Sequence, residues 1–252
     1  MAVVVNVNRQ WRAVTEPAFS HGFNLEKIKG IKPGTVSTRT EYIDIEEGDG
    51  EYDLPVFRTR RTVEFGGYVV ADSAQELNRM GDRHAGLLAG GDLGRLTVED
   101  EGERRWMRVR LHGTPEFEPT YKARADFGLE LRAPDPRMFG KPESITAPVV
   151  SVVNRGNFRS TPKITISGSG TNDYAVYGPG GRLWRVTRDL VAGHPHTLDF
   201  DNLALLVDGV EVTDGLTEAD PFACPPNKAT TITFDANGNT ATMNVTHYPT
   251  WI

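Results

Sequence analysis

Apolar side chains alternate with polar ones through much of the first half of the chain. Val63, Phe65 and Val69 can share one face of a strand over 61–70, and Arg58 and Arg60 precede it. A period of two residues is typical of a strand that buries one face. The same period predicts three further strands, over 94–99, 104–111 and 121–132.

The period changes after residue 71, where the pattern predicts a helix. Ser73 and Glu76 have the spacing of a capping box, which satisfies two backbone N–H groups at a helix start. Gly90 and Gly91 predict the helix end, because glycine adopts the left-handed cap conformation at little cost. The expected apolar stripe consists of Ala74, Leu77, Met80, Gly81, His84, Leu87 and Leu88. His84 is interpreted as a packed histidine, and the first domain as a sheet carrying one helix, hence α+β.

The segments before residue 61 are less regular. Residues 1–8 predict a strand, and they become polar too soon for a signal peptide or a membrane span. Residues 17–34 are rich in glycine and proline and predict irregular structure. Residues 46–53 predict an acidic loop that contains Glu46, Glu47 and Asp49.

The second half has no helical period and many short apolar runs separated by turn residues. This arrangement predicts a β-sandwich or jelly roll, so the chain as a whole is expected to be mainly β. Asn237-Gly238 predicts a tight hairpin turn. The expected strands are 148–153, 163–167, 174–177, 183–187, 197–200, 204–207, 230–234 and 240–246.

Charge density predicts where one domain gives way to the next. Residues 1–144 carry 21 Lys and Arg and 24 Asp and Glu, whereas residues 145–252 carry 7 and 10. Together with the proline-containing stretch at 133–142, this shift predicts domains at 1–142 and 143–252.

The overall balance of charge argues against several classes of partner. A net charge of -6 with no basic stripe makes a dedicated nucleic-acid binder unexpected. The single cysteine, Cys224, has no partner for an internal disulfide and indicates synthesis in a reducing cytosol. No apolar run reaches the roughly 18 residues that a spanning helix needs.

A search for catalytic and cofactor motifs predicts that the chain is not an enzyme. The sequence contains no nucleophile elbow, phosphate loop or zinc-protease helix, and Gly178-Pro179-Gly180-Gly181 is interpreted as a turn. Glu99-Asp100 and Glu116/Glu118 are expected in or beside turns as solvated charges rather than as glycosidase acids. No cofactor is expected.

Two groups of side chains in the second half have residue types that can bind a ligand. His194 and His196 with Asp199 or Asp201 have metal-binding chemistry, but a polar turn before a strand explains them, and no metal is predicted. Tyr174, Tyr177 and Trp184 are either core aromatics or a docking surface that could stack a sugar ring. Both interpretations of the aromatics stay open.

One passage of the first domain is highly specific. The run Phe127-Gly-Leu-Glu-Leu-Arg-Ala-Pro-Asp-Pro-Arg-Met-Phe-Gly140 resembles the segment that closes the first domain of distal tail proteins (Dit) of long-tailed, siphovirus-type bacteriophages. The order of strand, capped helix and strands over 60–111 matches the same family. Residues 153–168 and 245–252 are similar to the start and end of its galectin-like second domain. The resemblance covers about residues 55–252.

The resemblance implies a structural role in the virion. In that family, first domains join into a ring, commonly of six subunits, at the distal end of the tail, and galectin-like domains project from it. The ring connects the major tail tube protein to the hub and fibre proteins of the baseplate, and the tape-measure protein and DNA pass through its lumen. These are the partners that the resemblance implies, and it implies no membrane partner.

The implied ring and the high charge density of the first domain together indicate candidate interface residues. A closed ring needs two different complementary patches on each subunit, and charges of both signs can fix their register. We therefore expect Arg58, Arg60, Arg61, Glu46, Glu47 and Asp49 at subunit or tube contacts. The alternatives are a carbohydrate-binding adhesion module of the tail tip and, less in keeping with the missing motifs, an enzyme that digests cell wall.

Overall fold

The computed structural model describes residues 3–15, 21–170, 173–238 and 240–252. The chain divides into two compact units, Met1–Met138 with Ile252, and Phe139–Trp251. Each is described by itself below as the first and the second unit. The functional division at residue 142 stays a prediction.

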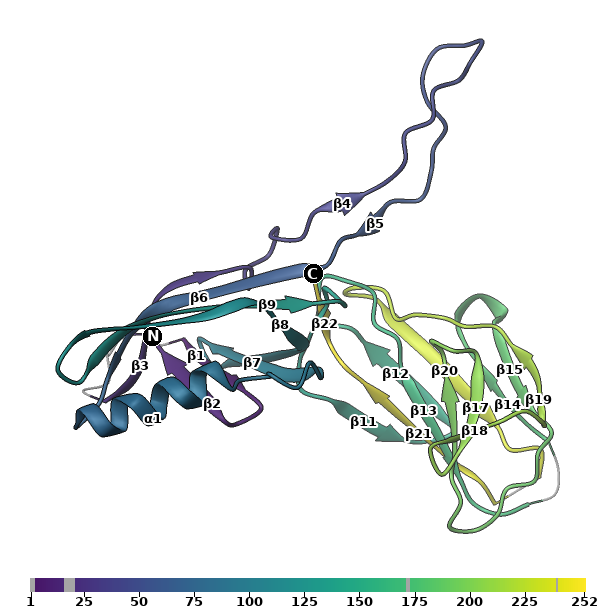
Figure 1. Ribbon diagram of the computed structural model, residues 1–252. Helices are drawn as coiled ribbons and strands as arrows, with labels where there is room; N and C mark the ends of the chain where they lie inside the picture. The colour runs from purple at the N-terminus through teal and green to yellow at the C-terminus, as the bar shows by residue number, and fades with distance from the viewer. Residues whose placement is uncertain (1–2, 16–20, 171–172, 239) are drawn as a thin grey trace. The chain divides into compact units, whose positions relative to one another are not determined.

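The first unit is a closed barrel, whereas the sequence predicts a sheet carrying one helix and does not indicate that the sheet closes. Its strand order is β8-β7-β1-β2-β3-β6-β9, and β8 also pairs with β9 (Figure 1). The barrel strands are β1 (Val4–Val7), β2 (Trp11–Val14), β3 (Gly22–Lys29), β6 (Arg61–Val70), β7 (Gly94–Asp100), β8 (Glu103–Tyr121) and β9 (Arg124–Ala133).

The length of β8 closes the barrel. Its first half pairs with β7, from Glu103 to Val109, and its second half pairs with β9, from Arg110 to Tyr121. The register shifts between His112 and Glu116 and again beside Pro119. At such bulges a strand can accommodate an extra residue or a proline and still remain paired with its neighbour. The predicted end at residue 111 is therefore wrong, as is the turn position expected for Glu116 and Glu118, which lie exposed on β8.

Two barrel strands were missed by the sequence patterns. β2 is only four residues long, and β3 lies within the stretch that was expected to be irregular. They pair in parallel, with Ala13 opposite Phe23. Residues 16–20 of that stretch lie outside the described ranges.

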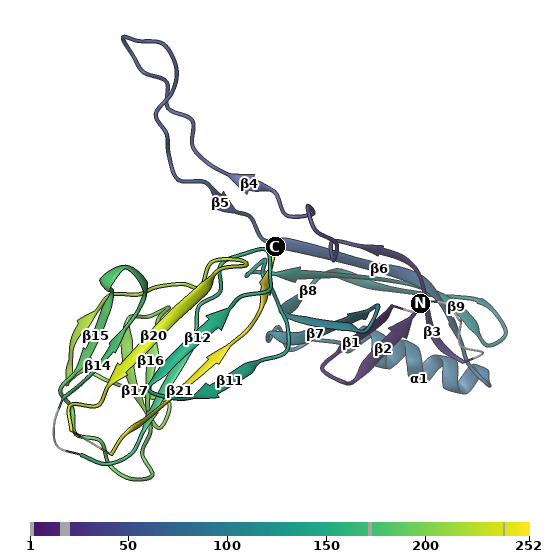
Figure 2. The same cartoon turned by 180° about the vertical axis from the view of Figure 1, so that it is seen from behind.

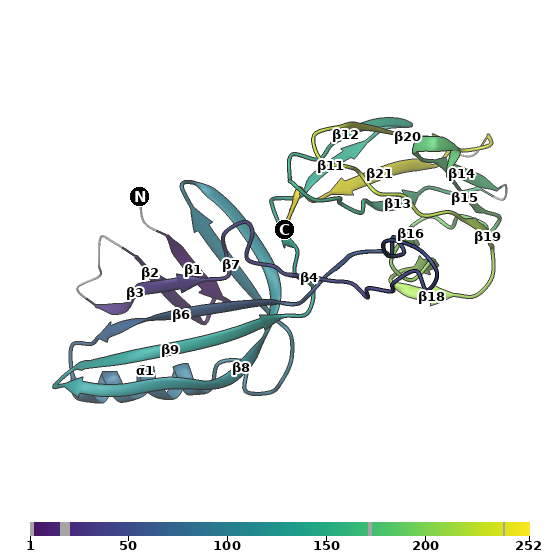
Figure 3. The ribbon, with the colours of Figure 1, turned by 90° about the horizontal axis from the view of Figure 1, so that it is seen from above.

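The predicted helix is confirmed as α1 (Ala74–Ala85), which lies along β8 and β9 (Figure 3). The Ser73 hydroxyl accepts a hydrogen bond from the Glu76 N–H, and Glu76 accepts one from the Asp72 N–H. Leu77, Met80 and His84 are buried on its inner face. The helix ends at Gly86, one turn before the predicted glycines.

The second unit consists of two antiparallel sheets around one core. The orders are β11-β21-β13-β16-β17-β18 and β12-β20-β14-β15-β19 (Figure 2). Ile164 and Val245 from the first sheet and Val176 and Ile232 from the second belong to the same buried cluster. The chain is thus mainly β.

Eight strands of the second unit follow the predicted runs, and four strands were missed. Three of the missed strands, β11 (Glu143–Thr146), β18 (Val210–Val212) and β19 (Leu216–Ala219), are short and mostly exposed, so they show little alternation. The fourth, β22 (Thr250–Trp251), has only two residues. The predicted strands are β12 (Val149–Val153), β13 (Lys163–Ser167), β14 (Tyr174–Tyr177), β15 (Leu183–Val186), β16 (His196–Asp199), β17 (Ala204–Val207), β20 (Ala229–Asp235) and β21 (Thr242–His247). β10 (Met138–Phe139) lies at the division between the units.

Two turns behave as their sequences predict. Asn237 and Gly238 both have positive φ, at 46° and 85°, as a tight hairpin turn requires. Asn239, which the same prediction included, lies outside the described residues. Pro179–Gly181 forms a short 3₁₀ turn between β14 and β15. In the described ranges, no helical segment has the length and apolar character needed to cross a membrane.

Candidate interaction surface

The most exposed feature of the first unit is a long hairpin between β3 and β6, which we call the arm and define as residues 38–58. β4 (Thr38–Arg39) pairs with β5 (Phe57–Arg58) at its base. Farther out, the Tyr52 N–H donates to the Ile43 carbonyl at 2.9 Å. The arm leaves the barrel at the start of β6 and extends into solvent (Figures 1 and 2).

The surface of the arm combines acidic and apolar side chains. Residues 41–53 contain seven Asp or Glu and no Lys or Arg. Five large apolar side chains of the arm are 48–74% exposed: Tyr42, Ile43, Tyr52, Val56 and Phe57. Exposed apolar groups beside charge are typical of interaction surfaces. The acidic loop was expected from the sequence; its apolar flanks were missed, although Asp49-Gly50 between apolar runs is a hairpin signal.

The predicted interface residues occupy two ends of the arm. Glu46, Glu47 and Asp49 lie exposed at the tip, and Arg58 and Arg60 lie exposed at the base. The structure therefore does not bring the two groups together within one chain. Their role in contacts between chains stays a prediction.

Arg61 is different, and its predicted place on the interface is wrong. Its side chain is only 1% exposed. Nε donates to the Pro136 carbonyl at 2.8 Å, and Nη1 donates to the Gly30 carbonyl at 2.7 Å and to the Thr35 hydroxyl at 2.9 Å. Burial lowers the pKa of the guanidinium. Arg61 therefore ties the loop between β3 and the arm to the segment that follows β9, instead of meeting a partner.

The aromatic docking surface proposed for the second unit is also largely wrong. Trp184 and Tyr174 are 0% and 1% exposed, and only Tyr177 reaches the surface. Trp184 packs on Phe200 with ring centroids 4.8 Å apart. The core interpretation of Trp184 and Tyr174 is the correct one.

The histidines considered for metal binding do not converge. His196 is buried, and its Nδ1 lies 3.0 Å from the Tyr174 hydroxyl. His194 instead contacts Asp208. Asp199 accepts hydrogen bonds from the backbone N–H groups of residues 201 and 202, so it closes a turn.

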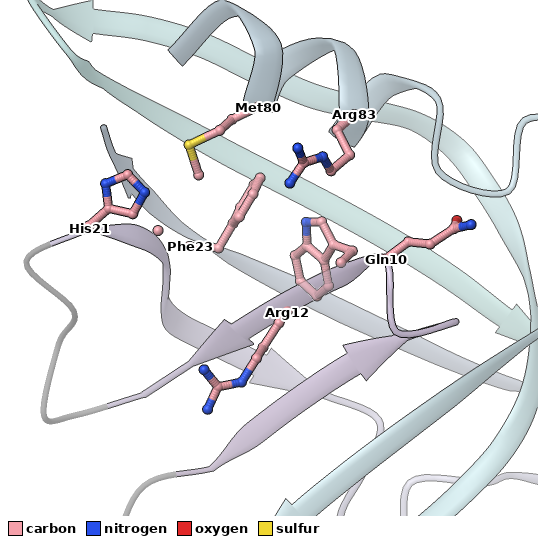
Figure 4. Close-up of a pocket in the computed structure, with 8 residues that line it drawn as sticks. Gln10, Arg12, His21, Phe23, Met80 and Arg83 are labelled. Carbon is pink, nitrogen blue, oxygen red and sulfur yellow. The ribbon is translucent and has the colours of Figure 1, made fainter. Parts of the chain in front are cut away.

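A shallow depression of about 320 Å³ lies between β2, β3 and α1, where Phe23, Met80 and Arg83 come together (Figure 4). Beside it, the His21 ring nitrogens lie 3.5 Å from Asp72 and 3.3 Å from Glu76. One ligand atom from each residue falls within 4.8 Å of the others, which a metal ion could use. Glu76 is already engaged in the helix cap, and the group acts as ion pairs that tie β3 to α1 when His21 is protonated.

Three histidines are fully buried: His84 in the first unit and His196 and His247 in the second. Burial lowers the pKa of each, and Arg188 lowers that of His196 further. His84 donates to the Gly128 carbonyl at 3.1 Å, so it is a packed histidine as predicted. Neither His247 nitrogen has a hydrogen-bond partner among the described residues.

These histidines predict acid sensitivity. Their folded pKa lies below the ordinary value of 6.5, so at lower pH the unfolded chain binds more protons. The free energy of unfolding is expected to fall below about pH 6.5, by up to about 1.4 kcal/mol per pH unit for each histidine, and to gain nothing above it. Urea unfolding at about pH 5 and pH 7.5 measures this. His247→Phe should reduce the pH dependence of the second unit, and a dependence equal to that of the unchanged protein would contradict the assignment.

Comparison with known proteins identifies the fold. No protein-family model matches the chain, and no curated protein sequence matches it. Among solved structures, the fold is similar to that of phage baseplate and hub adsorption proteins. Chains of the phage P2 baseplate in its activated conformation with Ca and with Sr align over 98% and 97% of both chains, with TM-scores of 0.54 and 0.51 and 6% identity.

The similarity to one distal tail protein is higher. The Dit protein (gp 19.1) of phage SPP1, described as a paradigm of the hub adsorption apparatus in Gram-positive infecting phages, aligns over 99% of both chains with a TM-score of 0.73 and 15% identity. The resemblance to distal tail proteins is thus confirmed at the level of the fold, through both units.

Proposed function

We propose that this chain is a structural, non-catalytic protein of the phage tail tip. In this proposal its first unit joins other copies in a ring, with six as the expected number, at the distal end of a siphovirus-type tail. The observation that carries the proposal is the alignment with SPP1 Dit over 99% of both chains, because it includes the barrel and the two-sheet unit together.

The partners follow from the same proposal. The ring connects the major tail tube protein to hub and fibre proteins, and its lumen passes the tape-measure protein and DNA. The second unit acts as a galectin-like docking platform, which agrees with its two sheets around one core. The chain is made in the host cytoplasm and ends in the virion.

The arm is the proposed contact element between copies. It is acidic, carries five exposed apolar side chains and extends away from the barrel that supports it. Apolar side chains of this size stabilise a protein interface when a neighbour covers them.

Removing the arm tests this role. A chain in which a short glycine-serine turn replaces residues 40–56 should keep its fold, because these residues supply no fully buried side chain. The shortened chain should fail to assemble. The intact protein should give an annulus in negative stain and a solution mass that corresponds to a ring of several copies. The control Leu203→Ser/Val210→Ser removes exposed apolar groups elsewhere and should assemble normally. An annulus without the arm, or a monomeric intact protein, would contradict the proposal.

The carbohydrate-binding alternative has lost its main support. It rested on aromatic residues that could stack a sugar, and two of the three are buried. Binding of the intact protein to a glycan array, abolished by Tyr177→Ala, would revive it.

A further inference from the structure

Four arginines form a continuous positive strip on the outside of the barrel, which we call the arginine band: Arg95, Arg108, Arg110 and Arg132. All four are exposed and alternate with buried residues on β7, β8 and β9. Arg95 lies directly opposite Arg108, and Arg110 directly opposite Arg132. The band therefore crosses three neighbouring strands on one face.

The band is electrostatically unfavourable for an isolated chain. Like charges directly opposite each other across two strands destabilise a sheet. Among the described residues, no salt bridge is seen for any of the four. The nearest acid along β9, Glu130, contacts His112 at 3.7 Å instead. Within the described ranges, Arg95 alone of the four has another stabilising contact, with its guanidinium 4.3 Å from the ring centre of Trp106.

The tip of the arm carries the complementary charge. Its acids are Glu41, Asp44, Glu46, Glu47, Asp49, Glu51 and Asp53, with no basic residue between them. The hydrogen bonds of this segment run between the arm's own two legs, as from Tyr52 to Ile43 and from Ile45 to Gly50. Nine extended residues per leg give a reach of about 30 Å from the barrel. The acidic tip is thus presented to another molecule.

We propose that the acidic tip of one copy's arm binds the arginine band of a neighbouring copy. The tip and the band are different patches, so the contact is heterologous and each copy both gives an arm and receives one. Opposite charges at the two patches fix which surfaces meet. This inference rests on the proposed assembly of copies and specifies its receiving surface.

Paired charge reversals test the contact. Glu46→Lys/Glu47→Lys in the arm and Arg108→Glu/Arg110→Glu in the band should each raise the dissociation constant of assembly about tenfold or more. A chain with all four changes should assemble again, and so should an equal mixture of the two variants, because reversed arms then meet reversed bands. The matched controls, Asp201→Lys/Glu211→Lys and Arg79→Glu/Arg83→Glu, place the same charges elsewhere and should assemble as the unchanged protein does.

A disulfide cross-link tests the same contact in chains that keep most of their charges, so the result does not depend on whether the charge-reversed variants fold. Asp49→Cys chains mixed with Arg108→Cys chains should form a disulfide-linked pair, whereas Asp49→Cys mixed with Arg79→Cys should not. The native thiol does not compete, because Cys224 is buried and burial raises its pKa to about 11.

The outcomes separate the two proposals. An annulus that resists both reversals and gives no cross-link overturns the arm-to-band contact but leaves the ring intact. A monomeric intact protein overturns both. Heparin, a polyanion, tests another occupant of the arginine band. If Arg108→Glu/Arg110→Glu abolished heparin binding and left assembly unchanged, the band would bind a polyanion instead of the arm, and the inference would likewise be overturned.

Discussion

Arg61→Ala is expected to lower the free energy of unfolding of the first unit by about 3–5 kcal/mol. The side chain is 1% exposed and donates to two carbonyls and one hydroxyl. Removing it deletes three part-buried hydrogen bonds of a charged donor and leaves a cavity at a fully buried position between the loop after β3 and the segment after β9.

The neighbouring arginine supplies the control. Arg60 is exposed, so Arg60→Ala should change stability by less than about 0.5 kcal/mol. Arg61→Lys should also be less stable than the unchanged protein. The reason is that one ammonium group cannot reach all three acceptors that the planar guanidinium contacts. The urea dependence of hydrogen exchange in peptides from β6 and β9 reports on the first unit alone. Equal effects of the two alanine variants would show that Arg61 does not tie the loop after β3 to the segment after β9.

The contrast between Arg60 and Arg61 shows that a local sequence pattern predicts a strand but not the burial of each of its polar residues. The strand itself was predictable, since Val63, Phe65 and Val69 alternate locally, and all three lie on the buried face. The fate of Arg61 depends on Gly30, Thr35 and Pro136, which lie 26 to 75 residues away. No local pattern shows that these acceptors meet at one point.

Closure of the barrel was unpredictable for a related reason. Local signals around Gly113 and Pro115 favour a turn, but β8 continues because bulges keep it paired with β9. By contrast, the capped helix and the Asn237-Gly238 turn depend on residues within one turn of each other, and both were predicted correctly.

The candidate site was predicted in part. The acidic loop was evident from composition, but the arginine band becomes visible only when β7, β8 and β9 are placed side by side, because its members come from residues 95 to 132. The buried position of Trp184 could have been inferred: Leu183 and Arg185 alternate with Trp184 and Val186, so Trp184 shares the face of a valine.

That burial makes Trp184→Ala the second change with a large expected effect. The side chain is 0% exposed and packs on Phe200 within the core of the second unit. Truncation of a buried tryptophan costs about 3–5 kcal/mol through lost burial and the cavity left behind. Hydrogen exchange in peptides from β15 and β16 should report this loss while β6 and β9 are unaffected.

Two further variants distinguish a core residue from a docking residue. Tyr177→Ala removes a partly exposed aromatic side chain from the strand paired with β15 and should cost much less than Trp184→Ala. Trp184→Phe should also cost less than alanine, because it keeps an aromatic ring beside Phe200 and removes an indole N–H with no hydrogen-bond partner among the described residues. If Trp184 were a docking residue, none of these variants would change stability. Replacing Trp184 would instead abolish partner binding, and this outcome would contradict its assignment to the core.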